Sequence, residues 1–178
     1  MSASIVIFGA TGDLTSRKLI PALYSNFRKK RLPENTSVIG FSRTPLTDEE
    51  FRKEMRDALQ TPGPGGFDED SWRLFAQILF YQPGDMENAS ASHALATKLN
   101  ISGNPGQNCL YYLATAPRFF PVAISFLGEA GLFRESNQTG KRRIIVEKPF
   151  GRDLESALEL NRQLHTVAEE SQIYRIDH

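Results

Sequence analysis

Short apolar runs rich in β-branched residues recur along the whole chain, and this repetition constrains the fold more than any other feature. They lie at 5–8, 37–41, 78–82, 109–114, 143–147 and 173–176. Runs of this length and composition are typical of strands that are buried on both faces. Stretches with helical periodicity separate them. The alternation predicts an α/β fold, in which a doubly wound, six-stranded parallel sheet carries helices on both faces.

The helical stretches carry their own start signals. From 19 to 27 apolar residues recur at helical spacing, and Pro21 is expected to kink this helix or to lie near its first turns. Thr47 and Glu50 have the spacing of a capping box before the next helix. Later helical patterns are "SWRLFAQI", "ASASHALATKLN", "FFPVAISFLGEAG" and "DLESALELNRQLHTVAEE".

Composition limits the partners and the compartment. The 178 residues suffice for one domain with a real core. The 21 acidic and 21 basic side chains balance, so neither nucleic acid nor a membrane is expected as a partner. No apolar run has the length of a membrane span, and the first residues lack the features of a signal peptide. We expect a cytoplasmic protein in which Cys109, within an apolar run, is a buried and inert thiol.

The first apolar run leads directly into "GATGDLTSRKL", a glycine-rich turn that opens a helix. Unpaired N–H groups and the helix dipole make such a helix start favourable for anions. Gly9 permits the tight turn, and Gly12 lets a diphosphate approach the backbone without a Cβ in the way. Thr15 stands where a third glycine is usual. The turn predicts a Rossmann-type dinucleotide site, with a plain tight turn as the alternative.

The second apolar run indicates which coenzyme such a site would bind. NAD sites often end this strand with Asp or Glu, which binds the ribose 2′-hydroxyl. Here the strand ends "GFSRT", with Arg43 at its tip. A guanidinium can bind a 2′-phosphate through two parallel hydrogen bonds, so Arg43 favours NADP, with the Thr44 hydroxyl beside it. An ordinary surface arginine is the alternative. After the third run, Asp85 and Met86 line the adenine side or form a plain turn.

Four motifs, in this order and spacing, resemble the glucose-6-phosphate dehydrogenase family: "GATGDLTSRKL", "IGFSRTPLT", "RIIVEKPFGRDL" and "QIYRIDH". "EKPFGRDL" and "YRIDH" are much more specific than a glycine pattern. The resemblance implies an oxidoreductase that moves hydride from C1 of β-D-glucose 6-phosphate to the nicotinamide of NADP+. The products are NADPH and 6-phospho-D-glucono-1,5-lactone, in the first step of the pentose phosphate pathway. No metal ion is expected.

The resemblance also assigns coenzyme contacts by motif position. It implies a diphosphate turn made of Gly9, Thr11, Gly12, Asp13 and Leu14. It implies that Arg43 holds the 2′-phosphate of NADP and that Tyr112, in "LYYLA", falls near the coenzyme. Many family members have alanine where this chain has Thr15, whose hydroxyl could bond a phosphate or cap the helix.

Further residues are assigned to the substrate side. Lys18 corresponds to a lysine near the junction of coenzyme and sugar phosphate. Lys148 reaches both substrate and coenzyme, and a cis peptide bond is expected before Pro149. In the family, His178 binds the sugar phosphate, while Asp177 orients a histidine general base.

The position of that base decides what we expect of the chain itself. His93 and His165, its other histidines, lie in helical stretches. We therefore expect 1–178 to be an NADP-binding domain truncated before an α+β substrate and dimerisation domain, which would supply the base. Such a fragment would bind NADP and be inactive alone. The full-length enzyme is expected to be a homodimer or homotetramer.

Two other functions fit part of the pattern. A free-standing NADP-binding sensor or regulatory module would need the glycine turn and Arg43 but no catalysis. A short-chain reductase or epimerase carries a Tyr-x-x-x-Lys pair after the fourth strand, and "APRFFPVAISFLGEAGLF" holds neither residue type. The dehydrogenase is favoured because Lys148 and Asp177 should share the carboxyl edge of the parallel strands with Arg43.

Overall fold

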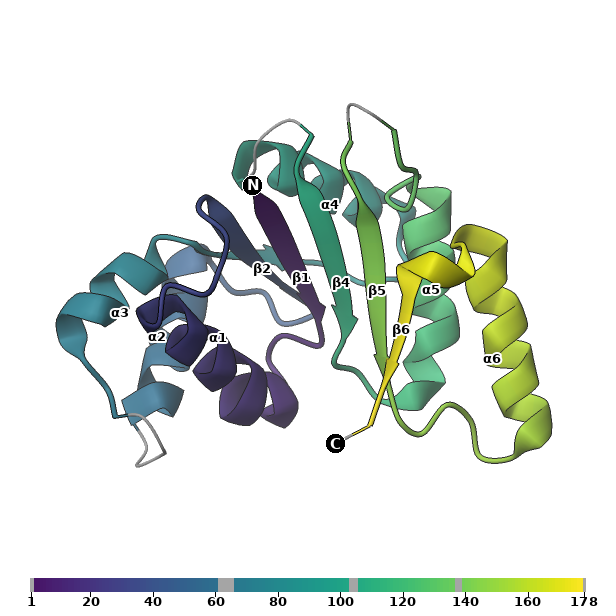
Figure 1. Cartoon of the computed structure of the whole chain (residues 1–178), viewed down its shortest axis with the longest axis horizontal. Coiled ribbons are helices and arrows are strands. Elements are labelled where there is room, and N and C mark those ends of the chain that lie inside the picture. Colours follow the sequence, from purple (N-terminus) through teal and green to yellow (C-terminus); the bar gives the residue numbers. More distant parts are fainter. Residues whose placement is uncertain (1, 61–65, 103–105, 137–138, 178) are drawn as a thin grey trace.

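A single parallel sheet organises the molecule (Figure 1). The computed structural model describes residues 2–60, 66–102, 106–136 and 139–177. Six strands lie in the order β3-β2-β1-β4-β5-β6 and all pairs are parallel. They are β1 (Ala3–Phe8), β2 (Thr36–Ser42), β3 (Leu79–Pro83), β4 (Asn108–Leu113), β5 (Arg142–Glu147) and β6 (Ile173–Ile176). The order reverses between β1 and β4, so the predicted doubly wound Rossmann-type fold is confirmed.

The helices form two layers, one on each face of the sheet (Figure 1). One layer contains α1 (Ile20–Arg28), α2 (Asp48–Gln60) and α3 (Glu69–Ala76). The other contains α4 (Ala89–Ser102), α5 (Phe120–Glu129) and α6 (Leu154–Val167). Among the described residues, no helix combines the length and the apolar character that crossing a bilayer requires.

Burial on both faces explains why the strand sequences are continuously apolar. Ile7 packs with the α1–α3 layer, whereas the adjacent Phe8 packs with the α4–α6 layer, and both are at most 1% exposed. Burying one such side chain contributes about 1.5–3 kcal/mol to the free energy that favours folding. Cys109 lies in the second core and is 3% exposed, as expected of an inert thiol.

Local signals place the helix starts as predicted. The N–H of Thr47 donates to Glu50 Oε2 at 2.8 Å, and the N–H of Glu50 donates to Thr47 Oγ1 at 3.2 Å, which is the expected capping box. The Thr47 N–H also lowers the pKa of Glu50. Pro21 lies in the first turn of α1, after a π-helical turn over Thr15–Leu19. The helix runs on through this point, because the N–H of Ile20 already donates to the Thr15 carbonyl, and the adjacent π-helical turn accommodates a residue that lacks an N–H.

Side chains cover the outer edge of β3, the strand at one end of the sheet order. Arg52 of α2 donates two hydrogen bonds to the carbonyl of Leu79, at 2.9 and 2.8 Å. Asp48 Oδ1, also on α2, accepts the N–H of Tyr81 at 2.6 Å. Lys98 of α4 reaches Asp48 at 2.9 Å, so one carboxylate joins the two helical layers around this edge.

Candidate functional site

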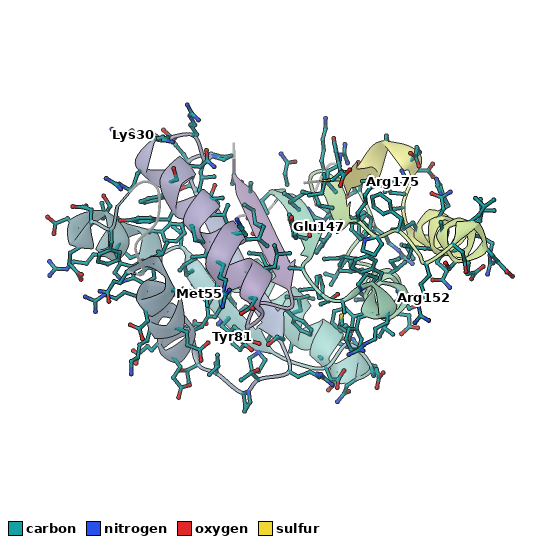
Figure 2. All side chains as sticks on the ribbon, turned by 90° about the horizontal axis from the view of Figure 1, so that it is seen from below. Lys30, Met55, Tyr81, Glu147, Arg152 and Arg175 are labelled. Atoms are coloured by element: carbon teal, nitrogen blue, oxygen red, sulfur yellow. The ribbon has the colours of Figure 1, made fainter. Side chains whose placement is uncertain are left out.

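The parallel strands bring the predicted functional segments to one rim, where the strands end (Figure 1). Gly9 follows β1, Arg43 follows β2 and Asp85 lies after β3. Lys148 follows β5, and Asp177 follows β6. His178 lies outside the described residues. Figure 2 views the molecule from the side of this rim, with Glu147 at the end of β5.

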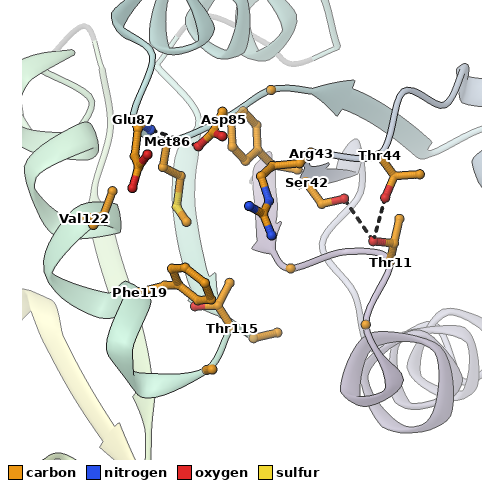
Figure 3. A pocket seen from close by; sticks show the side chains of 16 residues that line it. Thr11, Ser42, Arg43, Thr44, Asp85, Met86, Glu87, Thr115, Phe119 and Val122 are labelled. Carbon is orange, nitrogen blue, oxygen red and sulfur yellow. Dashed lines mark hydrogen bonds between the residues drawn. The ribbon is translucent and has the colours of Figure 1, made fainter.

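A cavity of about 340 Å³ opens on this rim where the strand order reverses. Its size falls within the range of about 300–1,000 Å³ for small-molecule sites. The loops after β1, β2, β3 and β4 form its walls. The lining residues are Gly9, Thr11, Gly12, Phe41, Ser42, Arg43, Thr44, Gly84, Asp85, Met86, Glu87, Ala114, Thr115, Ala116, Phe119 and Val122 (Figure 3).

The glycine turn is held tightly against the strands beside it. Gly9 has φ +82°, and a Cβ there would lie 2.6 Å from the carbonyl oxygen of Ala114. Its N–H donates to the Phe41 carbonyl at 2.9 Å, and its carbonyl accepts the N–H of Gly12 at 2.9 Å. Thr15 is fully buried and donates its hydroxyl to the same Gly9 carbonyl at 3.2 Å. This hydroxyl therefore braces the turn instead of facing the cavity.

A group of hydroxyls lies beside Arg43 on one side of the cavity (Figure 3). Thr11 Oγ1 lies 3.0 Å from Ser42 Oγ and 3.3 Å from Thr44 Oγ1. Between these hydroxyls and Phe119, the side chain of Arg43 points into the cavity (Figure 3). The Arg43 guanidinium carbon is 5.9 Å from the centre of the Phe119 ring. A cation and several hydroxyls facing one space favour an anionic, oxygen-rich ligand group.

The other side of the cavity is largely apolar. Met86, Phe119 and Val122 face the same space across from Arg43 (Figure 3). Asp85 Oδ1 accepts the N–H of Glu87 at 3.1 Å. Asp85 therefore lines the cavity and also closes a turn. A flat aromatic group would find apolar surface here next to the polar half of the cavity.

Five of the predicted coenzyme or substrate residues lie outside the lining of this cavity within the described chain: Asp13, Leu14, Lys18, Tyr112 and Lys148. Asp13 is exposed and lies 3.7 Å from Arg17. Lys18 is also exposed, in the π-helical turn. Tyr112 donates its hydroxyl to Glu147. Burial, and then the hydrogen bond to Glu147, raises the pKa of Tyr112.

The substrate-side pair meets at the ends of β5 and β6. Lys148 Nζ lies 2.5 Å from Asp177 Oδ2, and the two side chains are 56% and 64% exposed. The Lys148 N–H donates to the Ile176 carbonyl at 3.2 Å. The Lys148–Pro149 peptide bond is cis, as expected. The histidine that the resemblance assigns to Asp177 would lie beyond this chain, and the Asp177 carboxylate here has Lys148 as one partner.

Several lining residues were not predicted from sequence. Ser42, Glu87, Thr115, Phe119 and Val122 line the cavity in addition to the residues expected there. Position alone could have indicated Thr115 and Phe119, because they follow β4, at the reversal of strand order where open α/β sheets bind ligands. His93 and His165 lie on α4 and α6, outside the lining, and both are exposed.

Known proteins are similar to this chain in both sequence and fold. The family model described as "Glucose-6-phosphate dehydrogenase, NAD binding domain" matches residues 6–178. Glucose-6-phosphate 1-dehydrogenase of Aggregatibacter actinomycetemcomitans is 44% identical over 178 residues, which cover 98% of this chain and 35% of that protein. The crystal structure of the Mycobacterium avium enzyme superposes with a TM-score of 0.86 at 34% identity, over 100% of this chain and 37% of that one.

A second solved structure, a glucose-6-phosphate dehydrogenase in complex with its substrate glucose-6-phosphate, gives a TM-score of 0.84 at 33% identity. It is matched over 99% of this chain and 36% of its own. The chain thus spans about a third of the length of the relatives it matches. The match to the NAD-binding model over nearly all residues, with the same fold, shows that this chain belongs to the glucose-6-phosphate dehydrogenase family.

Proposed function

We propose that this chain is the NADP-binding domain of a glucose-6-phosphate 1-dehydrogenase. The observation that carries the proposal is the position of Arg43, which points into a cavity at the carboxyl end of the strands. Residues 1–178 would form one coenzyme domain. A second, α+β domain would provide the remainder of the substrate site and the dimer contact, in line with the greater length of the relatives.

The cavity suits the adenosine half of NADP. The Arg43 guanidinium would bind the 2′-phosphate through parallel charge-assisted hydrogen bonds, with the Thr44 hydroxyl as an added donor. The adenine would lie against Met86 and Phe119. A dinucleotide threaded from this cavity would pass Gly9 and Gly12, where the diphosphate meets the turn at the start of the first helix. Asp13 and Leu14 would flank that turn from outside the cavity.

The choice between NADP and NAD rests on charge. The strand end that commonly carries Asp or Glu for the ribose 2′-hydroxyl carries Ser42, Arg43 and Thr44 instead. A carboxylate would repel a 2′-phosphate, whereas the guanidinium attracts it. We therefore propose NADP as the preferred coenzyme of the NAD-binding fold.

The same rim would hold the sugar phosphate beside the nicotinamide. Bound NADP+ would accept the hydride from C1. Lys148 is exposed at the end of β5, and its ammonium would attract the phosphorylated sugar once it leaves Asp177. Lys18 and His178 would complete the contacts with the sugar phosphate. Tyr112 would lie near the coenzyme, with its hydroxyl held by the hydrogen bond to Glu147. A related structure contains glucose-6-phosphate as substrate, which supports this assignment.

Asp177 would orient the general base rather than act as the base. A carboxylate that accepts the N–H of an imidazole fixes its tautomer and stabilises the charge that it gains on taking a proton. The two histidines of the described chain, His93 and His165, lie on α4 and α6 instead of on the rim. The base would therefore come from the second domain, and its imidazole would replace Lys148 as a partner of the Asp177 carboxylate.

Calorimetric titration of the chain with NADP+ and with NAD+ tests the coenzyme assignment. We expect measurable binding of both and tighter binding of NADP+, without oxidation of glucose 6-phosphate by this chain alone. Equal affinities for the two coenzymes would contradict the role of Arg43. Turnover of glucose 6-phosphate by these residues alone would contradict the assignment of the base to another domain.

A further inference from the structure

Tyr81 of β3 lies beneath the hydroxyl side of the cavity and is 2% exposed. Its ring is 5.0 Å from the ring of Phe51 in the α1–α3 core. Its hydroxyl oxygen reaches the loop after β2, at 2.7 Å from the Thr44 carbonyl and 2.8 Å from Ser42 Oγ. A core tyrosine thus contacts both neighbours of Arg43.

The direction of these hydrogen bonds follows from counting hydrogens. The Thr44 carbonyl can only accept, and Tyr81 has a single hydroxyl hydrogen. Both short contacts of the Tyr81 oxygen are hydrogen bonds only if Tyr81 donates to the Thr44 carbonyl and Ser42 donates to Tyr81. The assignment of one hydrogen therefore fixes the next.

The same count extends to the surface of the cavity. Because the Ser42 hydrogen is used, the 3.0 Å contact between Ser42 and Thr11 requires Thr11 to donate. The 3.3 Å contact between Thr11 and Thr44 then requires Thr44 to donate. This last hydrogen bond is the longest of the series and joins two exposed residues. The Thr44 hydrogen is consequently the one that can turn most easily toward a ligand.

We propose that Tyr81 is a positioning residue for coenzyme choice, which holds the loop that carries Arg43 in place through the Thr44 carbonyl and the Ser42 hydroxyl, so that the guanidinium faces a 2′-phosphate. The inference rests on the proposed binding of NADP in this cavity. A fully ionised phosphate group accepts hydrogen bonds and cannot donate them, so it needs donors around it. The 2′-hydroxyl of NAD carries no charge, so the exact position of the guanidinium matters less to it.

Replacing Tyr81 with phenylalanine removes this constraint. Ser42 would lose the acceptor that its hydroxyl has at 2.8 Å, so one tie between the core and the loop after β2 would be gone. The Thr44 carbonyl would also lose a partner at 2.7 Å, so the backbone next to Arg43 would be held less firmly. Both changes weaken binding of a 2′-phosphate more than binding of a 2′-hydroxyl.

The test compares adenosine 2′,5′-bisphosphate with 5′-AMP, because these probes differ only in the 2′-phosphate. Calorimetric titration of the whole chain gives the ratio of the two affinities. We expect Tyr81→Phe to weaken the bisphosphate by about five- to tenfold, the usual effect of one hydrogen bond. Binding of 5′-AMP should change by less than about twofold. A general folding defect would lower both affinities together and leave their ratio unchanged.

Tyr24→Phe is the matched control. Tyr24 lies in the same core, is 4% exposed, and donates its hydroxyl to the Asp68 carbonyl at 2.8 Å, away from the cavity. Its replacement should leave the ratio of affinities as in the unaltered chain. Ser42→Ala removes the hydrogen bond from Ser42 to Tyr81 while it keeps the one from Tyr81 to the Thr44 carbonyl. It should therefore lower the ratio by less than Tyr81→Phe does.

The double variant tests whether Ser42 acts through Tyr81. If it does, Ser42→Ala adds little to Tyr81→Phe. An unchanged ratio in Tyr81→Phe, or fully additive effects of the two substitutions, would overturn the inference while NADP binding stood. A chain that binds 5′-AMP as tightly as the bisphosphate before any substitution would overturn the proposed coenzyme instead.

Discussion

The ammonium of Lys148 and the carboxylate of Asp177 lie 2.5 Å apart and tie the end of β5 to the end of β6. Both side chains are more than half exposed, at 56% and 64%. Water and salt screen a pair of this kind, so its geometry says more about the site than about stability.

Asp177→Asn should therefore lower the free energy of unfolding by at most about 1 kcal/mol, as measured by urea denaturation. Asp48→Asn is the control of the same chemistry at a more buried place, because Asp48 is 28% exposed and binds both Lys98 and the Tyr81 N–H. We expect about 1–3 kcal/mol for Asp48→Asn. A larger loss for Asp177 than for Asp48 would show that the Lys148 pair holds the fold.

Arg43→Ala should lower the affinity for NADP+ by about 10- to 100-fold, which corresponds to the loss of charge-assisted hydrogen bonds. NAD+ has no 2′-phosphate, and its affinity should change by about twofold or less. Arg73→Ala, which removes an exposed arginine of α3 far from the cavity, controls for net charge. Equal losses for the two coenzymes would mean that Arg43 does not bind the 2′-phosphate.

Gly9→Ala should destabilise the chain by two separable effects. The backbone at φ +82° is strained for alanine, by about 1–3 kcal/mol, and the new Cβ would lie 2.6 Å from the Ala114 carbonyl oxygen. Gly66 has φ +63° with no atom within 4 Å of an added Cβ, so Gly66→Ala measures the backbone strain alone. Thermal unfolding should show a larger loss for Gly9. Equal losses would mean that the turn moves to relieve the contact with Ala114.

Burial raises the pKa of the Cys109 thiol from its usual 9.0 to about 11. Folding therefore favours the neutral thiol over the thiolate. The contribution of Cys109 to the free energy of unfolding is full below pH 9 and is lost as the pH rises toward 11. The stability of Cys109→Ala should fall less over this interval than that of the unaltered chain. A thiol reagent at pH 8 should label Cys109 only when denaturant is added, and rapid labelling of the native chain would contradict its burial.

The sequence predicted the strands well because each is apolar on both faces. Phe8 and Ile39 belong to such runs. A short, continuously apolar run is typical of a strand that is covered by helices on both faces, so these segments were predicted as strands. Because the strands were expected to be parallel, Gly9, Arg43 and Lys148 could be assigned to one rim before any side-chain contact was known.

The details of the site were less predictable because they depend on tertiary contacts. Comparison with the family left the Thr15 hydroxyl either to bond a phosphate or to cap the helix, and its hydrogen bond to the Gly9 carbonyl becomes visible only in the folded turn. Phe119 faces Arg43 from a 3₁₀ turn before α5, 76 residues further along the chain. Tyr81 appears in the sequence as one more apolar strand residue, and no local pattern reports the hydroxyl contacts that it makes with the loop after β2.

The covered edge of β3 has a consequence for how copies of this protein meet. Arg52 occupies the Leu79 carbonyl and Asp48 occupies the Tyr81 N–H, and these are groups that an incoming strand would need. A neighbouring chain that approached β3 would have to displace the charged side chains of Arg52 and Asp48 from their hydrogen bonds before it formed its own hydrogen bonds to the β3 backbone. Pairing of a second copy along this side of the sheet is thereby disfavoured.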